Sequence, residues 1–261
     1  QRATVGATWG GSDWGIHVSS DVNYTFESGN QGALAARVYE AYASTDLMGY
    51  ASVTAGRQAL DYGSGAIMSS NQWGATRSTW DGFNIGIDLD MADITLGYGN
   101  TSGADSDSTG RSQMWLNAAK GDGDWTANLL YTSTTVGTAD AMTAMGLDLG
   151  YAMMGGDLNL DVSYNTTSDG TTDGDMTSIG ATYNVNESMS ITGNQTSYGE
   201  NGFDAGSAGM QGYASSGSLG YLSADDKDMN VGITYAMGDF NLGATMHQIT
   251  NEVTNAADRD V

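Results

Sequence analysis

Short runs of alternating apolar and polar residues dominate this sequence. In Asp157–Tyr164, written DLNLDVSY, every second side chain is Leu, Val or Tyr, and those between are Asp, Asn or Ser. The same alternation recurs in Ala144–Met153, in Asn230–Met237 and again from Phe240 onward. A period of two predicts strands with one apolar and one polar face.

The alternation predicts an all-β, antiparallel sheet of about fourteen strands, and up to sixteen. Their approximate bounds are 3–9, 14–27, 33–43, 49–57, 82–90, 92–99, 111–119, 124–133, 142–153, 157–165, 176–184, 187–197, 209–222, 228–236 and 238–249. Tight connections alternate with longer polar ones, which is the arrangement of an outer-membrane barrel. We find no linker, so residues 1–261 are expected to form a single domain. The chain ends NEVTNAADRDV, without a terminal aromatic residue, which leaves the strand number open.

Composition decides which face of these strands meets lipid. The chain has no Pro and no Cys, and only two lysines stand against the many Asn, Asp, Ser and Thr of the polar faces. Absence of Pro suits a backbone paired in ladders, and absence of Cys excludes disulfides. No apolar run approaches the roughly 20 residues of a membrane helix. We therefore predict a transmembrane β-barrel with a wet, polar interior, located in the bacterial outer membrane.

The aromatic residues support the same prediction. Six Trp and fourteen Tyr stand against four Phe. Trp and Tyr favour the membrane–water interface, where the ring is apolar and its polar tip is hydrated. Seven residues near strand ends are the predicted aromatic girdle: Trp9, Trp14, Trp125, Tyr151, Tyr164, Tyr183 and Tyr235.

The net charge of −23 limits the partners. Nucleic acid is excluded, because binding phosphates requires clustered Lys and Arg. Cations and small hydrophilic solutes are the expected cargo and membrane lipid the expected surroundings, while a homo-oligomer is compatible with both.

One stretch, Gly56–Gly82, interrupts the alternation for more than twenty residues. A long loop after an early strand can fold inward and narrow a barrel, so residues 57–80 are the candidate constriction loop. The stretch holds two of the six arginines, Arg57 and Arg77. With Asp61, Asp81 and Glu40 they can either pin the loop to the wall or set ion selectivity at the narrowest point. Arg37 belongs to the same group, although its strand parity is opposite to that of Glu40 unless a β-bulge intervenes.

The same stretch resembles the signature of alginate-export-like outer-membrane porins. The resemblance is carried by Gly56-Arg57-Gln58, Gln72-Trp73, Arg77-Ser78 and Asp81, and it covers roughly Arg37–Leu89. It implies a passive diffusion channel. Because the chain is much shorter than eighteen-stranded alginate exporters, neither their strand number nor alginate as the substrate is carried over.

Other chemistry finds little support. The two histidines, His17 and His247, have no recognisable catalytic partners, so we do not expect an enzyme. No cofactor is expected, although calcium at Asp105 and Asp107 remains an alternative because that loop begins like a calcium-binding loop. The predicted function is a porin that prefers cations. The alternative is a structural or adhesive outer-membrane or surface-layer β-protein with a plugged lumen, binding calcium.

Overall fold

The chain forms a single antiparallel sheet in which each strand pairs with the next. The computed structural model describes residues 1–24, 34–72, 77–101, 110–206, 222–251 and 259–260. The strands run in sequence order from β1 to β15. They are β1 (Arg2–Gly10), β2 (Trp14–Tyr24), β3 (Leu34–Asp46), β4 (Ser52–Gln58), β5 (Trp80–Leu89), β6 (Ala92–Thr101), β7 (Arg111–Asp122), β8 (Trp125–Val136), β9 (Met142–Met153), β10 (Leu158–Ser168), β11 (Asp173–Asn186), β12 (Met189–Tyr198), β13 (Asp226–Met237), β14 (Phe240–Asn251) and β15 (Arg259–Asp260), with one helical turn, η1 (Met154–Gly156).

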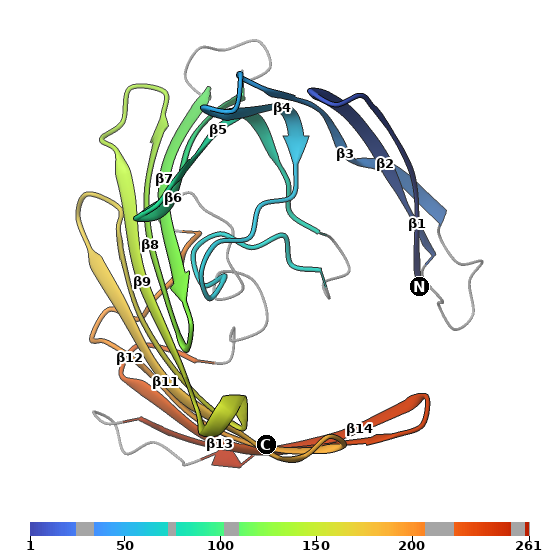
Figure 1. Ribbon diagram of the computed structural model, residues 1–261. Helices are drawn as coiled ribbons and strands as arrows, with labels where there is room; N and C mark the ends of the chain where they lie inside the picture. Colours follow the sequence, from blue (N-terminus) through green and yellow to red (C-terminus); the bar gives the residue numbers. More distant parts are fainter. Residues whose placement is uncertain (25–33, 73–76, 102–109, 207–221, 252–258, 261) are drawn as a thin grey trace.

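The sheet curls around a central space as the wall of a barrel (Figure 1). Within the described residues β1 pairs with β2 alone, and β14 pairs with β13 and with the two-residue strand β15. The wall is therefore open between β1 and β14 (Figure 1). The prediction of about fourteen antiparallel strands in a barrel-like sheet is confirmed.

Short turns and long loops lie at opposite ends of the strands, as predicted. The connections 11–13, 47–51, 90–91, 123–124, 154–157, 187–188 and 238–239 share one end, which we call the turn end. The opposite, loop end carries the two longest connections, 59–79 and 199–225. The strand expected at 209–222 lies, except for Leu222, outside the described residues, and β12 pairs directly with β13.

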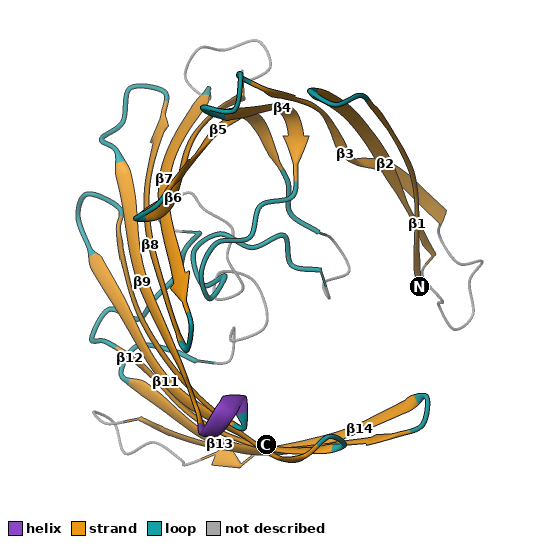
Figure 2. Cartoon of the chain, in the orientation of Figure 1, coloured by secondary structure: helices purple, strands orange, loops and turns teal. Residues whose placement is uncertain are grey.

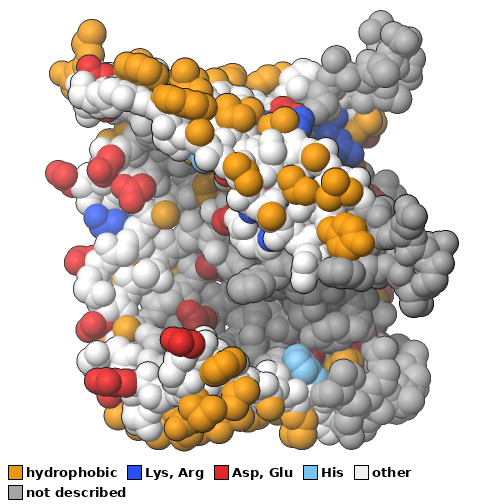
Figure 3. All heavy atoms as spheres, turned by 90° about the vertical axis from the view of Figure 1, so that its right-hand side faces the viewer, with side chains coloured by type: hydrophobic (Ala, Val, Ile, Leu, Met, Phe, Trp, Pro, Cys, Tyr) orange, Lys and Arg blue, Asp and Glu red, His pale blue; other side chains and the backbone are white. Residues whose placement is uncertain are grey.

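The alternating residues sort onto two faces as their period requires. On β9, the side chains of Leu147, Leu149 and Tyr151 are 41%, 46% and 50% exposed on the outside, whereas Ala144 on the inner face is 2% exposed. Figure 3 looks toward the open edge: hydrophobic side chains lie along the upper and lower parts of the view, and carboxylates gather at its left, where the turn end lies. Within the described part of the chain, no helix is long and apolar enough to cross a membrane.

Candidate functional site

The long connection after β4 leaves the wall and crosses the barrel interior (Figure 2). Its tip reaches the opposite wall, where the Ser64 amide donates to Asp148 Oδ2 at 3.0 Å. The Ser64 hydroxyl lies 3.2 Å from that of Ser163, which itself donates to Asp148 Oδ1 at 2.5 Å. Because Asp148 and Ser163 are partners across β9 and β10, the tip is fixed to these two strands.

A glycine starts this departure from the wall. Gly56 has a φ of +128°, where L side chains are strained, and a Cβ there would overlap the Ala41 carbonyl of the neighbouring strand. The following Gln58 turns inward and is 5% exposed. The backbone conformation thus explains why the first residue of the Gly-Arg-Gln sequence is glycine.

A hydrogen-bonded chain of buried side chains holds the base of the loop. Trp115 Nε1 donates to Asn84 Oδ1 at 2.8 Å, and Asn84 Nδ2 donates to Gln58 Oε1 at 2.9 Å. The hydroxyl of Tyr62, on the loop, interacts with the same indole, and burial raises the pKa of Tyr62 to about 12. Tyr62 therefore remains a neutral phenol at neutral pH.

Apolar packing fills the space between the loop and the wall behind it. Ile67 and Met68 are 2% and 0% exposed, and they belong to a cluster with Trp115 and Leu130 of the wall. Gly146 of β9 leaves room for Ile67, whose Cδ1 would lie 3.1 Å from a Cβ at that position. The loop therefore occupies this side of the lumen as a packed body.

Asp61 organises the loop itself. Its carboxylate accepts hydrogen bonds from the Ser69 hydroxyl at 2.9 Å, the Ser70 amide at 2.7 Å and the Ser70 hydroxyl at 2.6 Å. These bonds close the loop onto its own returning half. The geometry gives Asp61 a role in holding the loop's shape.

Arg77 anchors the returning half of the loop to the first strands. Its guanidinium forms a two-pronged ion pair with Asp21 of β2, and their side chains are 7% and 0% exposed. Further bonds join it to Thr4 Oγ1 at 3.0 Å and Gln72 Oε1 at 3.1 Å, and its Cζ lies 3.2 Å from the centre of the Tyr39 ring. Nearly all its donors are used, as expected of a guanidinium that pins a loop.

A β-bulge in β3 brings Arg37 and Glu40 to the same inner face. Ser19 pairs with Glu40 and Ser20 with Val38, so Tyr39 is the extra residue. Arg37 Nη2 donates to the Arg77 carbonyl at 3.0 Å and lies 3.9 Å from Asp21 Oδ2. Glu40 Oε1 accepts from the Ala59 amide at 3.2 Å. The opposite parity of these two residues in a plain ladder is thereby resolved.

Arg57 and Asp81 lie elsewhere, and the expectation that they line the constriction is corrected. They are direct partners across β4 and β5 and form a bidentate pair with two bonds of 2.7 Å. Their neighbours Gln58 and Trp80 are buried on the inner face, so parity turns Arg57 and Asp81 outward. Their side chains are 40% and 44% exposed near the loop end of the wall.

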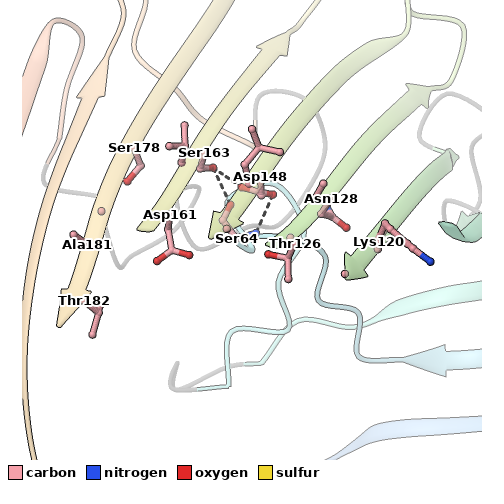
Figure 4. A pocket seen from close by; sticks show the side chains of 18 of the residues that line it. Ser64, Lys120, Thr126, Asn128, Asp148, Asp161, Ser163, Ser178, Ala181 and Thr182 are labelled. Carbon is pink, nitrogen blue, oxygen red and sulfur yellow. Dashed lines mark hydrogen bonds between the residues drawn. The ribbon is translucent and has the colours of Figure 1, made fainter. Parts of the chain in front are cut away.

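The open part of the lumen includes a recess of about 550 Å³ below the loop tip, at the turn end (Figure 4). Asp93, Asp148 and Asp161 contribute carboxylates to its lining. Lys120, at its edge, donates a hydrogen bond from its ammonium group to the Asp90 carbonyl at 2.6 Å, and its side chain points away from Asp161 (Figure 4). Neutral hydroxyls and amides from Thr126, Asn128, Ser178, Thr182, Thr192 and Asn194 complete this wall.

A second inward segment was not predicted from the sequence. Phe203, Ala205 and Leu222, from the connection between β12 and β13, are 5%, 0% and 8% exposed and join the same apolar cluster as the loop. Phe203 meets Tyr198 edge to face with ring centres 6.1 Å apart. Apolar residues within a stretch rich in Gly, Ser and Asp were the available signal.

The seven residues of the predicted girdle all lie on the outer surface. Their exposed fractions range from 41% for Trp125 and Tyr183 to 56% for Trp9. Trp9, Trp14, Trp125, Tyr151, Tyr183 and Tyr235 lie close to the turn end, whereas Tyr164 lies toward the loop end of β10. Six of the seven therefore form a band at one end.

The predicted calcium ligands Asp105 and Asp107 lie outside the described residues. In the described part of the chain, no group of three or more His, Cys, Asp or Glu side chains is placed to hold a metal ion. In the connection after β10, the Thr171 and Thr172 amides donate to Asp169 at 2.8 Å and hold its pKa below the ordinary value. This carboxylate closes a turn.

Comparisons with known proteins agree with this architecture. The family model described as Gram-negative porin matches residues 2–261. No curated protein matches the sequence. Among solved structures, OccK8 (OprE) of Pseudomonas aeruginosa is 12% identical with a TM-score of 0.65, over 99% of this chain and 85% of that one. OpdL of the same organism is 12% identical with a TM-score of 0.68, over 99% of this chain and 78% of that one. The outer-membrane protein OmpT of Vibrio cholerae is 14% identical with a TM-score of 0.57, over 100% of this chain and 85% of that one.

Proposed function

The chain belongs to the Gram-negative porin family, and on that premise we propose that it is a cation-preferring diffusion channel. It is an outer-membrane porin of the bacterial envelope, a passive channel and not an enzyme. The cation preference is our inference from the charges that line the lumen.

The observation that carries the preference is how unevenly the inward charges are compensated. The guanidinium of Arg77 forms an ion pair with the buried carboxylate of Asp21. Asp161, by contrast, is exposed on the inner face, and within the described residues its carboxylate has no hydrogen-bond or ion-pair partner. Fixed carboxylates along a pore raise the local concentration of cations.

The residues around the loop hold it in place inside the lumen, which is consistent with the proposed channel. Asp61 and Arg77 hold the loop across the lumen, and Arg37 and Glu40 are two of the charged groups beside it. A carboxylate and a guanidinium facing one lumen permit local discrimination by charge. Arg57 and Asp81 are not part of this proposal, because both face outward.

The reversal potential in asymmetric potassium chloride tests the preference. We expect its sign to indicate excess cation flow, and Asp161→Asn to reduce its magnitude because a lumenal charge is lost. Asp122→Asn is the matched control, since Asp122 is exposed at the end of β7 with outward parity. An anion-selective wild-type channel would refute the preference.

Three finer points remain proposals. Cargo is expected to be small hydrophilic solutes or ions, in a lipid environment and without a cofactor. A homo-oligomer is supported by the trimer form described for OmpT of Vibrio cholerae. The likeness of residues 37–89 to alginate-export-like porins stays a prediction.

A plugged structural barrel is the second candidate. Two inward segments, around Ile67 and around Phe203, share one apolar cluster inside the lumen, and this observation favours it. A folded, inserted protein that conducts no ions would favour it over the channel.

A further inference from the structure

A second recess opens on the inner face of β1, β2 and β3, beside the loop. Its volume is about 370 Å³, and Gly6, Thr8, His17, Ser19, Glu40 and Arg77 are among its lining residues. It lies on another part of the wall from the larger recess, which is lined by β6 to β12.

A glycine and a buried hydroxyl are direct strand partners in the lining of this recess. Gly6, Ser19 and Glu40 form one row across the three strands. A Cβ on Gly6 would lie 2.8 Å from Ser19 Cβ and 2.9 Å from the Val18 carbonyl oxygen, so only glycine fits this close approach of β1 and β2. Ser19 is 4% exposed, and its Oγ has no hydrogen-bond partner within the described residues. A buried, unpaired hydroxyl is costly unless something binds to it.

Glu40 supplies the charge that faces this space. Its Oε1 accepts from the Ala59 amide, whereas its Oε2 lies 3.7 Å from His17 Nε2, beyond hydrogen-bonding distance. Arg77, which also lines the recess, is committed to Asp21. The carboxylate of Glu40 therefore keeps one oxygen available.

His17 is held next to that oxygen by neutral partners. Its Nδ1 lies 2.8 Å from the Thr8 hydroxyl, and its ring stacks on Tyr42 with centres 5.2 Å apart. When the Thr8 hydroxyl donates to Nδ1, the proton of the neutral imidazole resides on Nε2, toward Glu40. A second proton makes the ring a cation at this fixed distance.

We propose that this recess is a subsite for the ammonium group of small amine-bearing solutes, and that protonation of His17 weakens it. The proposal rests on the channel function proposed above. An ammonium offers three donors and a positive charge, which match the oxygens of Glu40 and Ser19. Protonated His17 supplies the same charge internally and competes with the solute for Glu40.

We next consider which of the charged and titratable groups near His17 could change charge between pH 5 and 8. Glu40 and Tyr42 face it from β3, and Thr8 faces it from β1. One row further along are Asp21, Arg37 and Arg77, which are joined to one another. Of these groups, only histidine ordinarily changes charge between pH 5 and 8.

The test is the permeability ratio of methylammonium to potassium, from bi-ionic reversal potentials at about pH 8 and about pH 5. We expect Glu40→Gln to lower this ratio at the higher pH by about two- to fivefold, which is the range of a partly exposed ion pair. Ser19→Ala should lower it as well. In the wild type the ratio should fall on acidification, and His17→Gln should abolish that fall.

His247→Gln is the matched control, because the chain has two histidines and His247 lies on β14, paired with Asp228. It should keep the full dependence on pH. An unchanged ratio in Glu40→Gln, or a pH dependence that survives in His17→Gln, would overturn the subsite while leaving the channel intact. A stability gain in Ser19→Ala without any change in the ratio would also count against it. Loss of all conductance in the wild type would instead refute the channel function.

Discussion

Replacing Arg77 by methionine is expected to destabilise the protein and to widen the pore. The substitution removes the two-pronged guanidinium partner of the fully buried Asp21 side chain and leaves the longer contact of 3.9 Å to Arg37 Nη2. Breaking a buried ion pair in this way costs about 3 kcal/mol or more in the free energy of unfolding. The loop also loses the side-chain bonds of Arg77 to Asp21 and Thr4, while the bond from Arg37 to the residue-77 carbonyl remains, so we expect a larger and noisier single-channel conductance. Urea unfolding in lipid vesicles and bilayer recordings measure the two effects.

Two further variants separate the buried charge from the general loss of an arginine. Arg57→Met is the matched control at the other end of the same loop. Its ion pair with Asp81 is about 40% exposed on the outer surface, so its loss should cost less than about 1 kcal/mol and leave conductance unchanged. Asp21→Asn combined with Arg77→Met should recover much of the stability, because no lone charge remains buried. Equal effects of Arg57→Met and Arg77→Met would contradict this assignment.

Gly97→Ala is expected to expel Trp115 from the base of the loop. A Cβ at Gly97 of β6 would overlap the indole of Trp115, a residue that is 2% exposed. The indole would have to move and lose its bond to Asn84, and overpacking of this kind costs about 1–3 kcal/mol. The midpoint of urea unfolding should fall, and the loop should loosen because Tyr62 rests against the same ring.

Gly193→Ala is the control for this substitution. Gly193 also lies within a strand, β12, but a Cβ there would meet no atom within 4 Å. It should be neutral or slightly stabilising, since alanine loses less backbone freedom than glycine on folding. If Gly97→Ala proved equally harmless, the close contact between Gly97 and Trp115 would not be a feature of the folded protein.

The sequence predicts the wall of the barrel well, because alternate residues of a strand point to opposite faces of the sheet. The period-two alternation predicted four strands and the face that each of them turns outward, namely β9, β10, β13 and β14. The same parity rule, applied to Arg57 and Asp81, would have placed them outside the lumen. Their proximity in sequence to the loop suggested otherwise.

The site is less predictable, because it depends on contacts between residues far apart in the chain. The pairing of Arg77 with Asp21 joins residues separated by 56 positions, and no local pattern selects that carboxylate. The bulge at Tyr39 changes the parity of β3 without any mark in its alternation. Packing of Phe203 and Ile67 into one cluster likewise follows from how two loops fill the same space.

Single-channel conductance of the folded wild-type protein in a planar bilayer tests the central claim most directly. The account predicts stepwise ion conductance that increases when residues 61–70 of the loop are deleted, because this loop crosses the lumen and is bonded to the far wall. Absence of conductance from protein shown to be folded and inserted would contradict it. So would a conductance that is unaffected by the deletion, since the loop could then not narrow the pore.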